Sequence, residues 1–195
     1  MPQSTKLLFV SGSARADSLN KKLARLAAAI ATADGIPATF ADLGDYPMPL
    51  YDGDLEVKDG PPENAKKLEA LMQVHAGIFI AAPEYNAGIT PLLKNTLDWI
   101  SRVRAGGEAP LWVFKTRVFA LGAASTGGFG GVRGLIMVRQ TLQLGLGALV
   151  LPEQISLPHA RDTFDDDGNL RDKSRQETLQ SVIRKLAKAA HILYS

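Results

Sequence analysis

The chain has 195 residues, a formal net charge of +2 at pH 7 and no cysteine. A chain of this length buries roughly 70% of its unfolded surface, so we expect one domain over residues 1–195 that needs no disulfide or metal for stability. The lack of cysteine excludes disulfides, thiolate ligands and cysteine nucleophiles, and the charge is too weak and too evenly spread to indicate a nucleic-acid partner.

The N-terminal segment leads directly into a first predicted strand. Residues 1–5 lack a basic region followed by a long apolar stretch, so we expect no secretory signal. No apolar run reaches the ~18 residues that a membrane span needs, and we expect a cytoplasmic protein that binds no membrane. Lys6–Ser11 predicts a strand, and Leu19–Asp34 predicts a helix that stops at Gly35.

The next part of the chain repeats this alternation. Ile36–Leu43 predicts a second strand, and Gly44–Pro62, rich in proline, glycine and aspartate, predicts a long loop. Pro62–Val74 predicts a helix with proline in its first turn. Residues 77–82 are apolar throughout, as is typical of a parallel strand that is covered on both faces.

A fourth strand is predicted in the second half of the chain. A helix is expected over Pro91–Arg102 and a loop over Arg104–Pro110. The strand itself is predicted over Arg117–Ala124, with Trp112 and Phe114 leading into it.

The last third of the chain completes the pattern. Glycine-rich Thr126–Gly134 leads into a helix through about residue 144, Ala148–Leu151 begins a fifth strand that extends toward Leu157, and Ser174–Leu193 predicts a closing helix. Five strands alternating with about five helices predict a doubly wound α/β domain. We expect a parallel sheet of order 2-1-3-4-5 with helices on both faces.

The loop after the first strand is rich in phosphate-binding groups. In the predicted order the first and third strands are neighbours, so the loops after them meet at one crevice. The first loop supplies hydroxyl, amide and guanidinium donors beside a helix N-terminus: Ser11, Ser13, Ser18, Asn20 and Arg15. A nearby anion would also relieve Lys21 and Lys22, whose charge opposes the helix dipole. The structural alternative is that Ser18 only caps the helix and that the cations face solvent.

Two better-defined phosphate loops do not match this segment. A P-loop needs a second glycine followed by lysine and Ser/Thr, whereas this loop has one glycine and no lysine until after Asn20. A dinucleotide-binding loop needs three spaced glycines, and only Gly12 is present, although Asp42 ends the second strand where a ribose-binding acid could lie. The pattern therefore favours a mononucleotide.

Further motifs follow in order along the chain: Pro49-Leu50-Tyr51-Asp52, Pro83-Glu84-Tyr85-Asn86, Leu93-Lys94-Asn95-x-x-Asp98-Trp99 and the segment from Ser125 to Gln140. Together with Gly12-Ser13-x-Arg15-x-x-Ser18-x-Asn20, they resemble the NADPH-dependent FMN reductase family of flavodoxin-like flavoproteins, which includes bacterial quinone, chromate and azo-dye reductases. The resemblance covers most of the chain and implies a flavodoxin-like fold.

The resemblance also implies an FMN site. The FMN phosphate is expected at Ser11, Ser13, Arg15, Ser18, Leu19 and Asn20. The flavin ring is expected against the loop after the third strand and under the glycine-rich turn: Pro83, Glu84, Tyr85, Asn86 and Gly88, with Ser125, Thr126, Gly127 and Gly128 over its other side. We expect the loop to act through backbone N–H groups, with Gly88 in a shape that excludes a Cβ. The structural alternative is that both segments are ordinary turns.

The implied activity is hydride transfer from NADPH or NADH to the flavin, followed by ping-pong reduction of a quinone, free flavin, chromate or azo compound. The flavin carries this chemistry, so no catalytic side chain is expected. His75 and His191 lie in apolar helical contexts and are expected to be structural. Asp165–Asn169 is interpreted as a solvated turn rather than a calcium loop, because positions one and twelve of such a loop would be Thr163 and Ser174.

Two other classes of function stay open, a flavodoxin-like electron carrier and an FMN-binding module without catalysis. Carriers usually present an acidic face, and this chain is net positive. The resemblance further implies that the helix containing Trp99 and the 46–56 loop meet a second subunit, in a homodimer or homotetramer. Plain packing of Trp99 in the core is the alternative.

Overall fold

A computed structural model describes residues 5–104 and 106–194. Its main sheet has five strands, all paired in parallel. In spatial order they are β2 (Ala38–Asp42), β1 (Leu7–Ser11), β3 (Gly77–Ala81), β6 (Val118–Ala124) and β7 (Leu149–Leu157). Because β6 and β7 are the fourth and fifth strands of this sheet along the chain, the predicted order 2-1-3-4-5 is confirmed.

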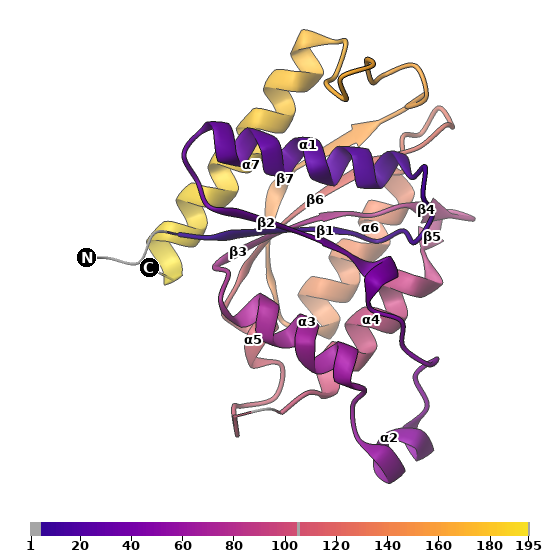
Figure 1. Cartoon of the computed structure of the whole chain (residues 1–195), viewed down its shortest axis with the longest axis vertical. Helices are drawn as coiled ribbons and strands as arrows, with labels where there is room; N and C mark the ends of the chain where they lie inside the picture. The colour runs from indigo at the N-terminus through magenta and orange to yellow at the C-terminus, as the bar shows by residue number, and fades with distance from the viewer. Residues whose placement is uncertain (1–4, 105, 195) are drawn as a thin grey trace.

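Helices cover both faces of the sheet (Figure 1). One face carries α1 (Leu19–Ala33) and α7 (Lys173–Tyr194). The other face carries four helices: α3 (Glu63–Gln73), α4 (Pro91–Arg102), α5 (Trp112–Lys115) and α6 (Val132–Gln140). Among the helices of residues 5–104 and 106–194, none is long and apolar enough to span a bilayer.

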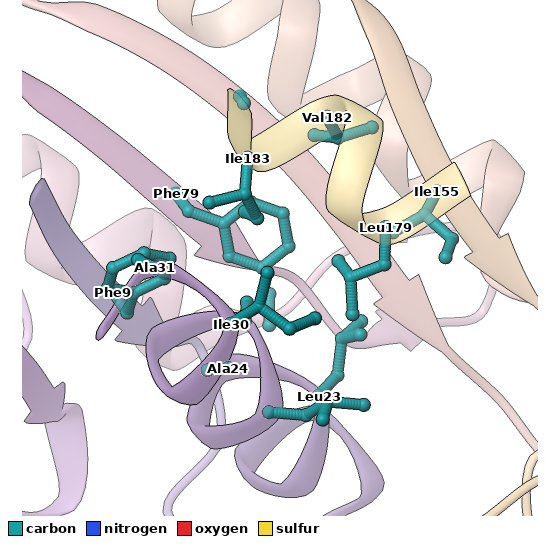
Figure 2. Packing of buried hydrophobic residues seen from close by; sticks show 14 of the residues in the cluster. Phe9, Leu23, Ala24, Ile30, Ala31, Phe79, Ile155, Leu179, Val182 and Ile183 are labelled. Carbon is teal, nitrogen blue, oxygen red and sulfur yellow. The ribbon is translucent and has the colours of Figure 1, made fainter. Parts of the chain in front are cut away.

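The core under α1 and α7 follows from helical periodicity. Leu23 and Ile30 of α1 share one face and pack on the sheet, while Ile183 comes from α7 (Figure 2). The rings of Phe9 and Phe79, from the neighbouring strands β1 and β3, lie with their centroids 6.0 Å apart. Each such fully buried side chain contributes about 1.5–3 kcal/mol to folding.

The core on the opposite face includes the helix that follows the third strand. Trp99 of α4 is fully buried, and its Nε1–H donates to the Pro49 carbonyl at 2.8 Å. Asn95 on the same helix donates to Pro49 and accepts the N–H of Tyr51. The plain-core alternative therefore describes Trp99, and the motif around Asn95 fastens the 49–51 segment to α4.

The predicted long loop before α3 contains two short helices. They are a 3₁₀ turn, η1 (Leu43–Asp45), and α2 (Gly53–Asp59), which begins where Asp52 accepts the Asp54 N–H at 2.8 Å. α2 buries no residue, so it has no apolar period from which a helix could be predicted. An ion pair between Glu56 and Arg102, 2.8 Å long, connects it to α4.

Two other segments also differ from expectation. Trp112 and Phe114, which lead into the predicted fourth strand, lie in a short helix, α5, which has four residues and ends before β6. Phe114 is fully buried against Phe119 of β6, with ring centroids 6.2 Å apart. The helix predicted through about residue 144 is α6 continued by a π-helical turn, η2 (Thr141–Gly145).

Candidate functional site

A cavity of about 540 Å³ opens at the carboxyl edge of the sheet, and we call it the carboxyl-edge cavity. Its volume lies in the range of roughly 300–1,000 Å³ that is typical of small-molecule sites. Figure 1 shows the start of α1 and the short strand pair of β4 (Glu84–Tyr85) and β5 (Gly88–Ile89) at this same end of the sheet. The lining comes from the loops after β1, β3, β6 and β7: Ser13, Arg15, Asp17, Ser18, Leu19, Asn20, Lys22, Pro83, Glu84, Tyr85, Ala124, Ser125, Thr126 and Arg161.

Most of the predicted site residues therefore share one cavity. The remaining predicted residues lie outside the lining: Ser11, Asn86, Gly88, Gly127 and Gly128. Ser11 is fully buried, and its Oγ has no hydrogen-bond partner among residues 5–104 and 106–194. The two halves of the predicted site, one from each loop, are brought together by the pairing of β1 with β3.

The loop after β1 presents few free polar side chains to the cavity. Ser18 is the N-cap of α1, and its Oγ accepts the N–H groups of Asn20 and Lys21 at 3.2 and 3.3 Å. Ser13 Oγ accepts the Arg15 N–H at 3.4 Å. The Arg15 side chain is exposed and makes no hydrogen bond or ion pair within the described part of the chain. Arg15 is thus available to a ligand.

Asn20 and Lys21 are bound within the protein. The Asn20 amide donates to the Ala124 carbonyl and accepts the Ala124 N–H, both at 2.9 Å. It thereby fixes the start of α1 to the end of β6. Lys21 is buried and pairs with Asp42 at 2.7 Å, so the anion that relieves its conflict with the helix dipole is a side chain of the protein. Asp42 also accepts the Gly44 N–H at 2.9 Å. The carboxylate that was considered for binding a ribose is therefore already bonded within the protein.

The loop after β3 is a small hairpin that the sequence pattern did not predict. β4 (Glu84–Tyr85) pairs antiparallel with β5 (Gly88–Ile89). Asn86 and Ala87 between them have φ of 51° and 64°, as the central residues of a type I′ turn do. Gly88 is not in the left-handed region, and a Cβ there would meet only the Tyr85 carbonyl at 3.5 Å. The expected special shape falls on Asn86 and Ala87 instead.

The glycine-rich turn divides into two parts. Ser125 and Thr126 line the cavity, while a Cβ on Gly127 or Gly128 would make only ordinary van der Waals contacts, 3.7 Å from Ser125 Oγ and from His159 Nε2. The left-handed backbone conformation that favours glycine occurs further along the chain, at Gly130 and Gly131, whose φ values are 61° and 87°. These two glycines let the chain turn back from β6 into α6.

Arg161 was missed by the sequence reasoning, although it lines the cavity. It follows β7, and the carboxyl ends of all parallel strands in a sheet share one edge, so its position after the fifth strand was the available signal. Arg15, Lys22 and Arg161 give the lining three cations, against the carboxylates of Asp17 and Glu84. The Glu84 charge is already paired with Arg133. The lining therefore favours an anionic ligand.

The Glu84 carboxylate has a lowered pKa. Burial alone would raise its pKa, but hydrogen bonds from the Gly134 N–H and from Arg133 outweigh burial and hold the pKa of Glu84 below its usual range. Glu84 is therefore charged at neutral pH and is an unsuitable general acid.

Comparisons with known proteins agree with this geometry. The sequence model of the NADPH-dependent FMN reductase family matches residues 5–162. A probable NADPH:quinone oxidoreductase 2 of Oryza sativa is 35% identical over 188 residues, covering 95% of this chain and 88% of the rice protein. An NAD(P)H-dependent FMN reductase of Pseudomonas aeruginosa is 33% identical over 190 residues, covering 95% of each chain.

A solved structure supports the fold. The flavoenzyme NAD(P)H:(acceptor) oxidoreductase FerB from Paracoccus denitrificans superposes with a TM-score of 0.79 at 24% identity. The match covers 97% of this chain and 98% of that one. At this level of identity the likeness concerns the doubly wound architecture.

Proposed function

The chain belongs to the NADPH-dependent FMN reductase family, and from this premise we propose that it binds FMN in the carboxyl-edge cavity and uses NADPH or NADH to reduce a small acceptor, foremost a quinone. The observation that carries the proposal is the lining itself. It places the N-terminus of α1, with Ser13, Arg15 and Ser18, beside the hairpin after β3.

The start of α1 suits the FMN phosphate. A helix N-terminus attracts anions, and the exposed Arg15 guanidinium can bind two phosphate oxygens at once. Ser13 and Ser18 accept backbone N–H groups through oxygen, which leaves each hydroxyl hydrogen free to be donated to a phosphate. Lys22 and Arg161 add positive charge on the same lining. The donor set therefore fits a phosphate monoester.

The hairpin suits the flavin ring. FMN, when bound, supplies the hydride and electron transfer. Backbone N–H groups at Glu84, Tyr85 and Asn86 are proposed to donate to the ring oxygens and so to favour its electron-rich form. Tyr85 lines the cavity and is 50% exposed, so its side chain can cover part of the ring. The side chains of the lining orient the cofactor and take no part in bond making.

We propose that the donor and the acceptor use the same open side of the cavity in succession, which is a ping-pong scheme. Relatives in rice and in Pseudomonas putida are named quinone oxidoreductase or quinone reductase, which puts quinones first among acceptors. Free flavins, chromate and azo compounds are further candidates. Parallel lines in double-reciprocal plots are the expected kinetic result, and intersecting lines would contradict successive use of one site.

A homodimer or homotetramer is part of the proposal. Leu50 and Val57, in the loop and short helix that extend from the sheet, are 77% and 89% exposed. Such apolar exposure is more typical of an interface than of a solvated loop. Light scattering at micromolar concentration is expected to give a mass above that of the 20.9 kDa chain. Because NAD(P)H is an intracellular reductant, we propose that the protein works in the cytoplasm.

The decisive experiment is an absorbance spectrum of the purified protein after loading with FMN and desalting, followed by anaerobic NADPH. Retained flavin bands that bleach on addition of NADPH are the expected result. Retained bands that stay unbleached would indicate an electron carrier or a binding module without catalysis. Loss of the flavin on desalting would point to a different phosphate-bearing ligand.

A further inference from the structure

Glu84 is an unusual residue for a cavity rim. It is the first residue of β4 and lines the cavity, yet its side chain is only 7% exposed. Burying a carboxylate is unfavourable unless hydrogen bonds and a counter-charge replace the lost water. The side chain of Glu84 has both.

Both carboxylate oxygens of Glu84 bind to the first turn of α6. Oε2 accepts the Gly134 N–H at 2.9 Å, and Oε1 accepts from the Arg133 guanidinium, with its Nε at 3.0 Å. The free N–H groups at a helix N-terminus carry a partial positive charge, which a carboxylate neutralises. α6 has no side-chain cap of its own, because Gly131 is the residue before its first turn. Glu84 supplies the missing acceptor from about fifty residues earlier in the chain.

The backbones of the hairpin and of α6 are also in close approach. A Cβ on Gly134 would lie 3.1 Å from the Glu84 Cβ and 3.3 Å from its Cα. A glycine at this position allows the hairpin to rest directly on the helix. Arg133 is held from the other side by Phe129, whose ring centroid lies 4.6 Å from the guanidinium carbon.

We propose that Glu84 is a positioning residue, whose side chain sets the hairpin of residues 84–89 against α6 and thereby holds the backbone N–H groups that face the flavin ring. This inference rests on the proposed function, because it concerns the ring of the same FMN. The side chain touches neither the phosphate nor the reacting atoms, since both of its oxygens bind to α6. It links the loop after β3, which lines the cavity, to the helix after β6, which lies outside the cavity lining.

The sequence predicts that the loop acts through its backbone N–H groups, in which case the side chain of Glu84 would matter less than the path of the loop. The side chain and the path of the loop are not independent, because the Glu84 carboxylate determines the path. A defect at Glu84 is therefore expected on the ring side of FMN and not on the phosphate side. Riboflavin, which has the ring without the phosphate, separates these two sides.

The test uses the full chain with three substitutions and one matched control. Glu84→Ala removes both contacts with α6, and Glu84→Gln removes the charge but keeps an oxygen acceptor for Gly134. Arg133→Ala removes the ion pair, together with the contact of Arg133 with Phe129, and leaves the Gly134 hydrogen bond. Glu153→Gln breaks a surface ion pair, to Lys185 at 2.6 Å, that lies outside the cavity lining. For each variant we would measure the Kd of FMN and of riboflavin, the flavin midpoint potential, and amide exchange in the flavin-free protein.

We expect Glu84→Ala to weaken FMN and riboflavin by the same factor, ~10-fold or more, because charge-assisted hydrogen bonds hold the hairpin. Glu84→Gln and Arg133→Ala should lose less affinity for both flavins, and Glu153→Gln should keep the affinity of the unmodified protein. Faster amide exchange should be confined to residues 84–89 and the first turn of α6. The midpoint potential should fall in Glu84→Ala, because looser N–H donors favour the reduced ring less.

Three results would overturn the proposal: unchanged riboflavin affinity and midpoint potential in Glu84→Gln and Arg133→Ala, a loss of FMN affinity without a loss for riboflavin, or accelerated exchange spread over the whole sheet. If Glu84→Ala does not fold, the other two variants decide the question. Failure of the unmodified protein to bind FMN at all would instead overturn the proposed function, which keeps the two failures distinct.

Discussion

The loop after β1 and the hairpin after β3 reach the same cavity by different physical means. In the first loop the polar side chains mostly build the loop itself, since Ser18 caps α1, Asn20 binds Ala124 and Lys21 pairs with Asp42. In the hairpin, Glu84 and Tyr85 line the cavity, and the Glu84 carboxylate binds the first turn of α6. If FMN binds as proposed, its phosphate depends on Arg15 and a few hydroxyls, whereas its ring depends on the position of the hairpin backbone.

The number of polar residues in a loop therefore does not indicate how well the loop can bind a ligand. The sequence of the first loop offers many donors, but the fold uses several of them before any ligand arrives. The hairpin has fewer polar donors. Its conformation depends on the positive φ angles of its turn and on the contact of Glu84 with α6.

Substitution of Asn20 is expected to change stability most, because its side-chain amide binds the backbone of Ala124. Asn20→Ala leaves the buried N–H and carbonyl of Ala124 without partners, which should lower the free energy of unfolding by roughly 2–4 kcal/mol. Urea denaturation of the flavin-free protein measures this. Asn64→Ala is the matched control, because Asn64 is only half-buried and donates to Pro47. Equal losses in the two variants would show that Asn20 is not a structural link, and the contrast between the loops would fail.

Removal of the ligand gives the next effect. FMN at 100 times its Kd should raise the free energy of unfolding by about 2.7 kcal/mol over the flavin-free protein. Hydrogen exchange should then slow more in residues 84–89 than at Asn20 and Lys21, whose N–H groups are already bonded to Ser18. Equal slowing at both places would mean that the first loop is also ordered by the ligand.

Arg15→Ala tests whether the first loop binds the FMN phosphate. Loss of a hydrogen-bonded charge should cost about 2 kcal/mol, or ~30-fold in the Kd of FMN, with little change for riboflavin. Arg15→Lys should recover part of the affinity, because it restores the charge without the planar fork. Arg25→Ala is the control, since Arg25 lies on α1 with its guanidinium over Phe40. The phosphate assignment fails if Arg15→Ala weakens riboflavin as much as FMN.

The smallest effect is a gain in stability in the hairpin turn. Ala87 has φ of 64°, a conformation that costs an L-residue about 1–2 kcal/mol. Ala87→Gly should raise the free energy of unfolding by about 0.5–1 kcal/mol, the remainder being offset by the greater freedom of glycine in the unfolded chain. Ala29→Gly on the exposed side of α1 should instead lower it by about 1 kcal/mol. Thermal unfolding of both variants provides the check.

The sheet was predictable because its strands are nearly continuous apolar runs. β1, β3 and β6 are buried along their whole length, and α1 has a clear apolar face. α2 and α5 could not be predicted, since one buries nothing and the other has only four residues. Their helical state depends on caps and on packing that no periodic pattern records.

The site was predictable where it follows a strand and unpredictable where it depends on distant partners. The segments after β1 and β3 were identified by their place after a strand and by their motif residues. Asn20 finds Ala124, and Glu84 finds Gly134, only because the fold brings β6 and α6 to them. Lys21 was expected to seek a ligand and instead pairs with Asp42, which β2 places beside it.

The fastening of the 49–51 segment to α4 has a consequence for association. Pro49 accepts hydrogen bonds from both Trp99 and Asn95, so Leu50 and Tyr51 are presented on a segment that is already ordered. Ordering a rotamer-rich side chain or a loop at an interface costs about 0.5–1.5 kcal/mol for each side chain that is immobilised. In the proposed homodimer or homotetramer, a subunit docking on this segment would meet a surface whose conformational entropy was lost during folding, so more of the free energy from apolar burial would go to holding the subunits together.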